Sequence, residues 1–340
     1  MTLLRSLAPL LLLTAAIGAF LHDPLTQGHW IWDPDVVNQV LVWFDLQARL
    51  WHRGEWPLWD PYLWMGQPLF GQVQPGAAYP LNWLLFASPL DGGHLRDAAP
   101  KAYFLAIHWM TAASGYVLLR GVGRSRTAAA MGGCVWSVTG LVGTTAWPQW
   151  LNGAVWAPLV IHHLLRAARP DGLARAAAAG AMAGIGWLAG HHQIPLLTMF
   201  AGVGLIAGEA WRGRRVRAAA SVAIFASMAF AVGAAQILPA IEYGWESVRW
   251  VGLERPVSAA GRVPYEAHRK LSLPPSSIAG FVLPEPQRVV DPFCGVVVMS
   301  MAAVGLATRW RSWRLRTVTA LGGVALLYAL GGYTPLQRTR

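Results

Sequence analysis

The chain is poor in charged residues, and acidic residues are the scarcest of them. Only 13% of its 340 residues are charged, and 16 residues are acidic. Soluble proteins carry roughly 25% charged residues, so this chain is far from their average. The chain is rich in long apolar runs, and 55% of its residues are hydrophobic. This composition excludes an ordinary soluble domain and predicts an all-α polytopic membrane protein.

Cysteine and lysine are also rare. Cys134 and Cys294 fall in separate apolar runs without metal-ligand spacing, which argues against a disulfide framework and against a zinc site. Because lysine occurs only at Lys101 and Lys270, the net charge of +11 comes almost entirely from arginine. The arginines cluster in short segments between apolar runs, so we attribute the charge to membrane topology and expect no nucleic-acid partner.

Apolar runs recur along the chain at lengths that suit helices crossing roughly 30 Å of hydrocarbon. We expect nine spans, at 3–21, 102–119, 127–145, 151–165, 176–190, 194–211, 218–238, 292–308 and 318–333. Arginine clusters occupy every second connection, as expected for cytoplasmic loops. We therefore predict a single transmembrane domain with its N-terminus in the cytoplasm. Its outer loops would be a large first loop at 22–100 and a second at 239–291.

The first outer loop holds much of the acidic charge of the chain. Asp33 and Asp35 flank a proline just before a helical pattern. A carboxylate in that place can cap the helix or act on a substrate, and the sequence leaves both roles open. Farther along, Asp45, Arg49 and Arg53 are spaced four residues apart, which on a helix puts them on one face. We expect these three side chains to pair with each other.

Tryptophan is dense between residues 43 and 64 of the same loop. Indole rings gather at membrane interfaces because they are amphipathic, and that alone explains several of them. Together with the interleaved leucines, they predict one or two amphipathic helices that lie in the interface. Such helices could form the wall of a groove for a polyprenyl chain.

Two outer turns carry further polar residues. His191 and Gln193 lie between two spans, and Gln149 and Asn152 lie at another turn. Imidazole can bind metal or transfer protons, but a turn that caps two helices explains the histidine equally well. We expect His191, Gln193 and Asn152 to contact a substrate head group.

Short motifs recur along nearly the whole chain in a recognisable order. They lie at 35–39, 53–61, 66–68, 79–82, 190–193, 236–239, 246–249, 271–274, 283–284 and 331–336. Among them are Gly-His-His-Gln at 190–193 and Gln-Ile-Leu-Pro at 236–239. Their order resembles the YfhO family of bacterial membrane proteins, which is assigned to the C-type glycosyltransferase superfamily (GT-C).

The resemblance implies a GT-C-like helical bundle in the bacterial cytoplasmic (inner) membrane, with its catalytic loops outside. It implies transfer of a sugar from a polyprenyl-phosphate donor in the lipid bilayer to an envelope glycan, polymer or protein. Asp35 would be the catalytic residue. Asp33 would be a second acid or a ligand for Mg²⁺ or Mn²⁺, and dependence on a metal stays open. Relatives usually continue beyond this length, so we expect an N-terminal fragment.

Sugar transfer from such a donor builds negative charge on the leaving phosphate, which cations would stabilise. Arg249 is the first candidate, followed by Arg269 and Lys270, and Glu242 is a candidate pocket residue. Surface salt bridges with neighbouring glutamates explain these cations equally well. A transporter or flippase of lipid-linked sugars and a non-catalytic envelope-assembly protein are the alternatives to an enzyme. We find no clear internal repeat that would favour a carrier.

Overall fold

A computed structural model of the chain describes residues 2–22, 26, 34–138, 147–167, 172–210, 213–250, 254–258, 261–270, 272–284 and 292–334. The side chains of residues 2–7, 209 and 268 are outside this description. The described chain is mostly helical, with a few short strands, in agreement with the predicted all-α class. It divides into two compact units, one of residues 1–138 and 142–240 and the other of residues 139–141 and 241–340.

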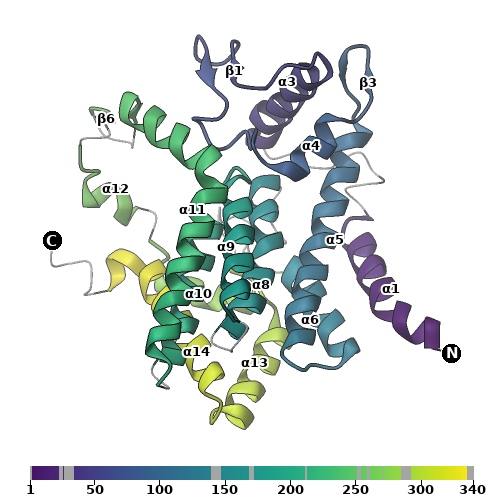
Figure 1. The fold of residues 1–340 in the computed structure, drawn as a ribbon, viewed down its shortest axis with the longest axis vertical. Helices are drawn as coiled ribbons and strands as arrows, with labels where there is room; N and C mark the ends of the chain where they lie inside the picture. The colour runs from purple at the N-terminus through teal and green to yellow at the C-terminus, as the bar shows by residue number, and fades with distance from the viewer. Residues whose placement is uncertain are drawn as a thin grey trace. The chain divides into compact units, whose positions relative to one another are not determined.

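The first unit is built on a bundle of long helices (Figure 1). They are α1 (Thr2–Phe20), α5 (Ala98–Gly121), α6 (Arg126–Val138), α8 (Pro148–Ala167), α9 (Gly172–Trp187), α10 (Gln193–Ala210) and most of α11 (Arg215–Glu246). Helix α5 packs against α6 and α8, and α8 packs in turn against α9 and α10. Helix α1 packs against α5 and α6, where Leu13 and Ile17 are buried against Ala112.

Small residues let the helices of this bundle approach closely. A Cβ atom added to Gly180 of α9 would lie 2.5 Å from the carbonyl oxygen of Phe225 in α11. A Cβ atom on Gly133 of α6 would meet the carbonyl oxygen of Ala112 in α5. Close backbone contacts of this kind are typical of helix pairs in membranes, where packing replaces the hydrophobic effect as the main attraction.

Residues 34–97, which belong to the predicted first outer loop, form a packed layer at one end of the bundle (Figure 1). Its elements are η1 (Val36–Val40), α3 (Leu41–His52), α4 (Pro80–Phe86), the antiparallel pair β1 (Trp59–Asp60) and β2 (Gln67–Pro68), and the antiparallel pair β3 (Leu90–Asp91) and β4 (His94–Leu95). Its main contact with the bundle is the first hydrophobic core, in which Val36, Phe44 and Phe86 pack with Phe104 and Leu151. The loop is therefore folded onto the helices and held by buried apolar area.

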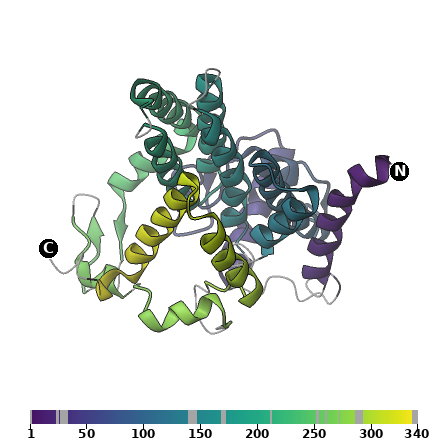
Figure 2. The ribbon, with the colours of Figure 1, turned by 90° about the horizontal axis from the view of Figure 1, so that it is seen from below.

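The second unit has its own elements. They are β5 (Val248–Arg249) and β6 (Val257–Ser258), which pair antiparallel, α12 (Tyr265–Arg269), η2 (Pro275–Phe281), α13 (Val296–Arg309), α14 (Trp313–Leu330) and η3 (Gly331–Tyr333). Figure 2 shows α13 and α14 as two consecutive helices joined by a short turn. Two hydrogen bonds tie α14 and η3 to the segment between α12 and η2, from Leu273 N to Ala329 O at 2.8 Å and from Gly332 N to Ser272 Oγ at 2.9 Å.

Each predicted span falls on a helix of the described chain, although residues 139–145 and 211 lie outside the described residues. Three helices are both long and apolar enough to cross a membrane, at Ala98–Gly121, Arg215–Glu246 and Trp313–Tyr333. Shorter apolar helices lie at Ala8–Phe20, Gln193–Gly208 and Val296–Arg309. The chain thus contains helices that could span a membrane, and the count of nine stays a prediction.

Candidate functional site

Asp35 lies in a helical stretch of the predicted first outer loop, directly before the π-helical residues of η1. Its side chain is exposed and makes no cap hydrogen bond to η1, the helix that follows it. Gln39 Nε2 donates to Asp35 Oδ1 at 3.5 Å, a long bond. The next residue, Val36, is buried in the first hydrophobic core, so the backbone beside the carboxylate is held in place. Asp33, the second predicted acid, lies outside the described residues.

The helical stretch that contains Asp35 includes an unusual turn. Residues Val36–Val40 form a π-helical segment before the α-helical α3. Single π-helical turns are rare and occur frequently at functional sites, because the wider turn redirects side chains. This segment therefore favours a functional role for the start of the helix over a purely structural one.

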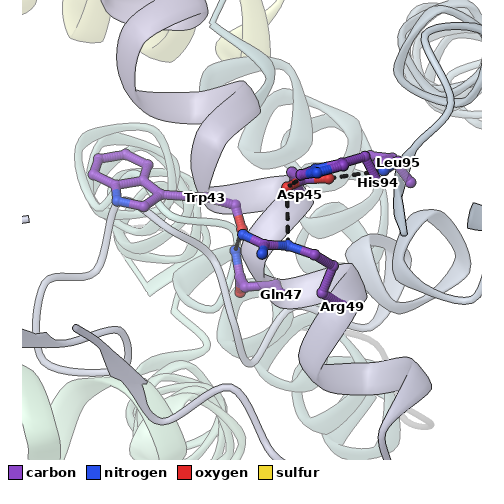
Figure 3. Close-up of polar contacts among 6 residues, drawn as sticks. All are labelled: Trp43, Asp45, Gln47, Arg49, His94 and Leu95. Atoms are coloured by element: carbon purple, nitrogen blue, oxygen red, sulfur yellow. Dashed lines mark hydrogen bonds and ion pairs between the residues drawn. The ribbon is translucent and has the colours of Figure 1, made fainter. Parts of the chain in front are cut away.

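Asp45 has a structural role in the same loop (Figure 3). Its Oδ1 accepts a hydrogen bond from Leu95 N at 2.7 Å, and its Oδ2 lies 3.1 Å from His94 Nδ1. Arg49 Nε lies 3.0 Å from the same Oδ2, which confirms the predicted pairing of Asp45 with Arg49. Arg53 is different from the prediction, because it pairs with Glu55 at 3.6 Å. Asp45 thus fastens the β3–β4 hairpin to α3.

Residues 70–79, the anchored loop, connect β2 to α4 and are held by glutamines from three helices. Each glutamine donates its amide N–H to one loop carbonyl: Gln47 of α3 to Pro75 at 3.1 Å, Gln149 of α8 to Gln74 at 3.0 Å, and Gln236 of α11 to Phe70. All three glutamines are at most 1% exposed. Within the described residues, the amide oxygen of each has no hydrogen-bond partner. The anchored loop is therefore fixed by buried polar contacts.

The backbone of the anchored loop is strained at one position. Val73 has φ +67°, in the left-handed region, which β-branched residues rarely adopt. Such a conformation costs about 1–3 kcal/mol and persists only where the surroundings enforce it. The glutamine hydrogen bonds on either side of Val73 supply that constraint.

A closed polar network binds the end of the anchored loop to α5 and α8. The Tyr103 hydroxyl lies 2.6 Å from Asn82 Oδ1 and 2.8 Å from Asn152 Oδ1, so either oxygen can accept its proton. Asn152 Nδ2 donates to Asn82 Oδ1 at 3.3 Å, and Asn82 Nδ2 donates to Gly76 O at 2.9 Å. Asn82 and Asn152 are fully buried. The predicted head-group residue Asn152 thus contributes to the interior, where it holds the loop.

Tyr79 extends this network. Its hydroxyl accepts a hydrogen bond from Trp156 Nε1 at 2.9 Å and donates one to Asn152 O at 3.3 Å. Burial raises the pKa of Tyr79 well above its usual range, and the hydrogen bond from Trp156 offsets only part of that increase. The phenol therefore stays protonated at neutral pH and cannot act as a general base.

His191 lies in the turn between α9 and α10. Its ring meets the ring of Trp150 edge-on, with 4.8 Å between the centroids. Burial, and then the neighbouring His192, lower the pKa of His191 to about 4. The imidazole is therefore neutral at neutral pH, with one nitrogen as donor and the other as acceptor. Gln193, the first residue of α10, is exposed.

The other predicted site residues belong to the second unit. Arg249 on β5, Lys270 after α12 and Glu242 on α11 are exposed. Arg269 Nε lies 3.3 Å from Glu266 Oε2, and both side chains are more than half exposed. This pair agrees with the salt-bridge alternative for Arg269, and exposed pairs of this kind contribute little to stability. Asp35 belongs to the first unit, whereas Arg249, Arg269, Lys270 and Glu242 belong to the second.

A divalent cation would need several oxygen ligands that converge on one point. In the part of the chain that the structure describes, no three His, Cys, Asp or Glu side chains form such a group. The described residues around Asp35 therefore do not make a cation site by themselves. Dependence on Mg²⁺ or Mn²⁺ stays a prediction.

Sequence reasoning missed Gln47 and Tyr103. It singled out the motifs that contain Gln236 and Asn82 but gave these two residues no structural contact. The available signal was an amide side chain flanked by apolar residues in a helix, as in Leu46-Gln47-Ala48 and Ala235-Gln236-Ile237. A buried amide needs a partner, and most buried polar groups find one. A search for such residues would have pointed to Gln47 in α3 and Gln236 in α11.

The resemblance to the YfhO family rests on short motifs alone. Of these motifs, residues 271 and 335–336 lie outside the described residues. No family model, no curated protein and no solved structure matches this chain.

Proposed function

We propose that this protein is a membrane glycosyltransferase of the YfhO type, which moves a sugar from a polyprenyl-phosphate donor to an extracytoplasmic acceptor of the cell envelope. The observation that carries the proposal is the exposed carboxylate of Asp35, which lies directly before Val36 of the first hydrophobic core and is therefore presented from a fixed backbone. An exposed carboxylate on a fixed backbone can reach the hydroxyl of an acceptor, as a general base must.

Asp35 acts as the general base in this proposal. Its carboxylate takes the proton of an acceptor hydroxyl while the hydroxyl oxygen attacks the anomeric carbon of the donor. The bond between the sugar and the phosphate breaks, and its electron pair stays on the phosphate oxygen. One base suffices for this displacement, which inverts the anomeric carbon. Arg249, Arg269 and Lys270 of the second outer loop remain candidates for binding the leaving phosphate.

The proposed setting is the bacterial inner membrane, with nine spans, the N-terminus in the cytoplasm and both large loops outside. Two observations support it. A helix coincides with each predicted span among the described residues, and arginine clusters mark alternate connections. The packing of the first outer loop against the bundle also supports an enzyme, because a reacting group must be held in position.

The experiment is sugar transfer by the purified chain in proteoliposomes. A panel of radiolabelled polyprenyl-phosphate sugars serves as donors, and cell-envelope extracts serve as acceptors. We expect label to move into the acceptor well above the level in protein-free liposomes. Movement of the intact donor across the bilayer without cleavage would support a flippase and overturn the proposal, as would no transfer with any donor of the panel.

A further inference from the structure

Three neighbouring side chains in the first unit carry buried polar atoms that have no hydrogen-bond partner among the described residues. They are Gln149 Oε1, Trp150 Nε1 and His191 Nδ1. Gln149 is 1% exposed, and its Nε2 is already used by the bond to Gln74 O. An unpaired buried donor or acceptor costs about 1–3 kcal/mol, so each such group in a folded protein needs an explanation.

The side chains that carry these atoms lie close together, at the start of α8 and in the turn between α9 and α10. Gln149 and Trp150 lie in the first turn of α8, and the Trp150 ring contacts the His191 ring. Gly190, with φ +90°, brings its backbone against Gln149, since an added Cβ atom would lie 2.7 Å from Gln149 Cγ and 2.8 Å from Gln74 O. The close approach of the turn to α8 thus depends on the glycine and puts the three side chains side by side.

A row of aromatic rings continues from this place to the surface. The rings of His191 and His192 are stacked, with centroids 5.8 Å apart and planes 10° apart. The rings of His192 and Trp187 are also nearly parallel, at 6.5 Å and 15°. His192 is exposed, so the row reaches the surface. The faces of such rings are electron-rich and attract the weakly positive C–H groups of a sugar ring.

The three unpartnered groups provide both kinds of hydrogen-bonding capacity without charge. The amide oxygen of Gln149 accepts, the indole N–H of Trp150 donates, and the imidazole nitrogen of His191 does either according to its tautomer. An anionic ligand would call for a cation, and none of these three side chains supplies one at neutral pH. Hydroxyl groups, which donate and accept in equal measure, match this set better than any charged group.

We propose that Gln149, Trp150 and His191 form a binding site for an uncharged pyranose sugar. The sugar hydroxyls pair with the three unpartnered atoms, and the apolar face of the ring rests on the row that includes His192 and Trp187. This inference rests on the proposed function and deepens it. It specifies that the sugar in this site, whether it comes from the donor or belongs to the acceptor, is uncharged. Uronic acids and phosphorylated sugars are excluded from the site.

Saturation-transfer NMR on the full chain in lipid nanodiscs tests the proposal without any transfer reaction. The probes are the methyl glycosides of glucose, galactose and N-acetylglucosamine, with glucuronic acid and glucose 6-phosphate as charged counterparts. Trp150→Phe and His191→Phe each keep an aromatic ring and remove the polar atom. Trp109→Phe is the matched control, since its indole N–H is already used by Thr14 Oγ1 at 3.1 Å on another part of the bundle. Thermal unfolding of each variant checks that it is folded.

We expect at least one neutral glycoside to receive saturation from the protein. The affinity falls about fivefold in each of the two site variants, as the loss of one hydrogen bond predicts, and is unchanged in the control. A polyprenyl-phosphate sugar added to the nanodisc displaces the probe if the site holds the donor sugar and leaves it bound if the site holds the acceptor sugar.

The proposal is overturned if no neutral glycoside binds, if the charged counterparts bind more tightly, or if both folded site variants bind as well as the unmodified chain. Its failure is distinct from that of the proposed function. If the protein transfers sugar but no glycoside binds at these three residues, only the proposed binding site is wrong. If a glycoside binds there but no sugar is transferred, only the proposed enzymatic function is wrong.

Discussion

Gln47 and Pro75 are joined by a hydrogen bond of 3.1 Å across 28 residues of sequence, from the glutamine amide of α3 to a carbonyl of the anchored loop. The same amide nitrogen donates to Trp43 O at 3.1 Å, one turn earlier in the helix (Figure 3). Since Gln47 is fully buried, this bond fixes the loop to the helix that begins near Asp35. The position of the anchored loop is thus coupled to that of the proposed catalytic segment.

Replacing Gln47 by leucine is expected to lower the free energy of unfolding by about 1–3 kcal/mol, because Pro75 O is left buried without a donor. Thermal unfolding in detergent measures the change. Gln72→Leu is the matched control, since Gln72 lies in the same loop and its Nε2 has no partner among the described residues. Equal stability of the two variants would show that the bond to Pro75 does not hold the loop.

Asp45→Asn is expected to release the β3–β4 hairpin from α3. The substitution weakens the bonds to Leu95 N and Arg49, at a cost of about 1–3 kcal/mol for a partly buried carboxylate. Limited proteolysis between residues 88 and 97 should become faster, while the rest of the chain stays protected. Unchanged proteolysis of the hairpin would contradict the structural role of Asp45.

Gly180→Val is expected to destabilise the first unit by about 1–3 kcal/mol, because the larger side chain pushes α9 away from Phe225 of α11. Gly18→Ala in α1 is the comparison, since an added Cβ atom there meets nothing within 4 Å. That variant should unfold at the same or a slightly higher temperature. A stable Gly180→Val variant would mean that the two helices are not in close contact.

The stability of the first unit should depend on pH through His191. Its pKa is about 4 in the folded chain, against roughly 6.5 when unfolded, so the unfolded chain binds more protons between these values. The stability is therefore fully present above pH 6.5 and falls as the pH drops toward 4. His191→Phe should remove this contribution, so the difference in unfolding temperature between variant and unmodified chain should change over that window. A constant difference would contradict a buried, neutral His191.

The helices were predictable from the sequence, and the polar interior was not. Apolar runs interrupted by arginine clusters predicted a helix at each of the nine places, because a chain in lipid must satisfy its backbone within each helix. The pairing of Asp45 with Arg49 was equally accessible, because a spacing of four residues puts two side chains on the same helix face.

The anchored loop could not be predicted, because its contacts depend on packing between distant segments. Gln149 and Gln74 are 75 residues apart, and Gln236 and Phe70 are 166 apart. No local pattern encodes such pairs. The sequence also suggested Asn152 as a contact for a head group, whereas its amide is used inside the protein by Asn82 and Tyr103.

The most direct test of the account is sugar transfer by Asp35→Asn in proteoliposomes, with Asp91→Asn beside it. Both carboxylates are exposed in the first outer loop, and both substitutions remove one charge without changing shape. The account predicts that Asp35→Asn unfolds at the unmodified temperature and transfers no sugar above background, because the base is gone, while Asp91→Asn transfers normally. Transfer by Asp35→Asn at the unmodified rate would contradict the account, since it would remove Asp35 from the mechanism.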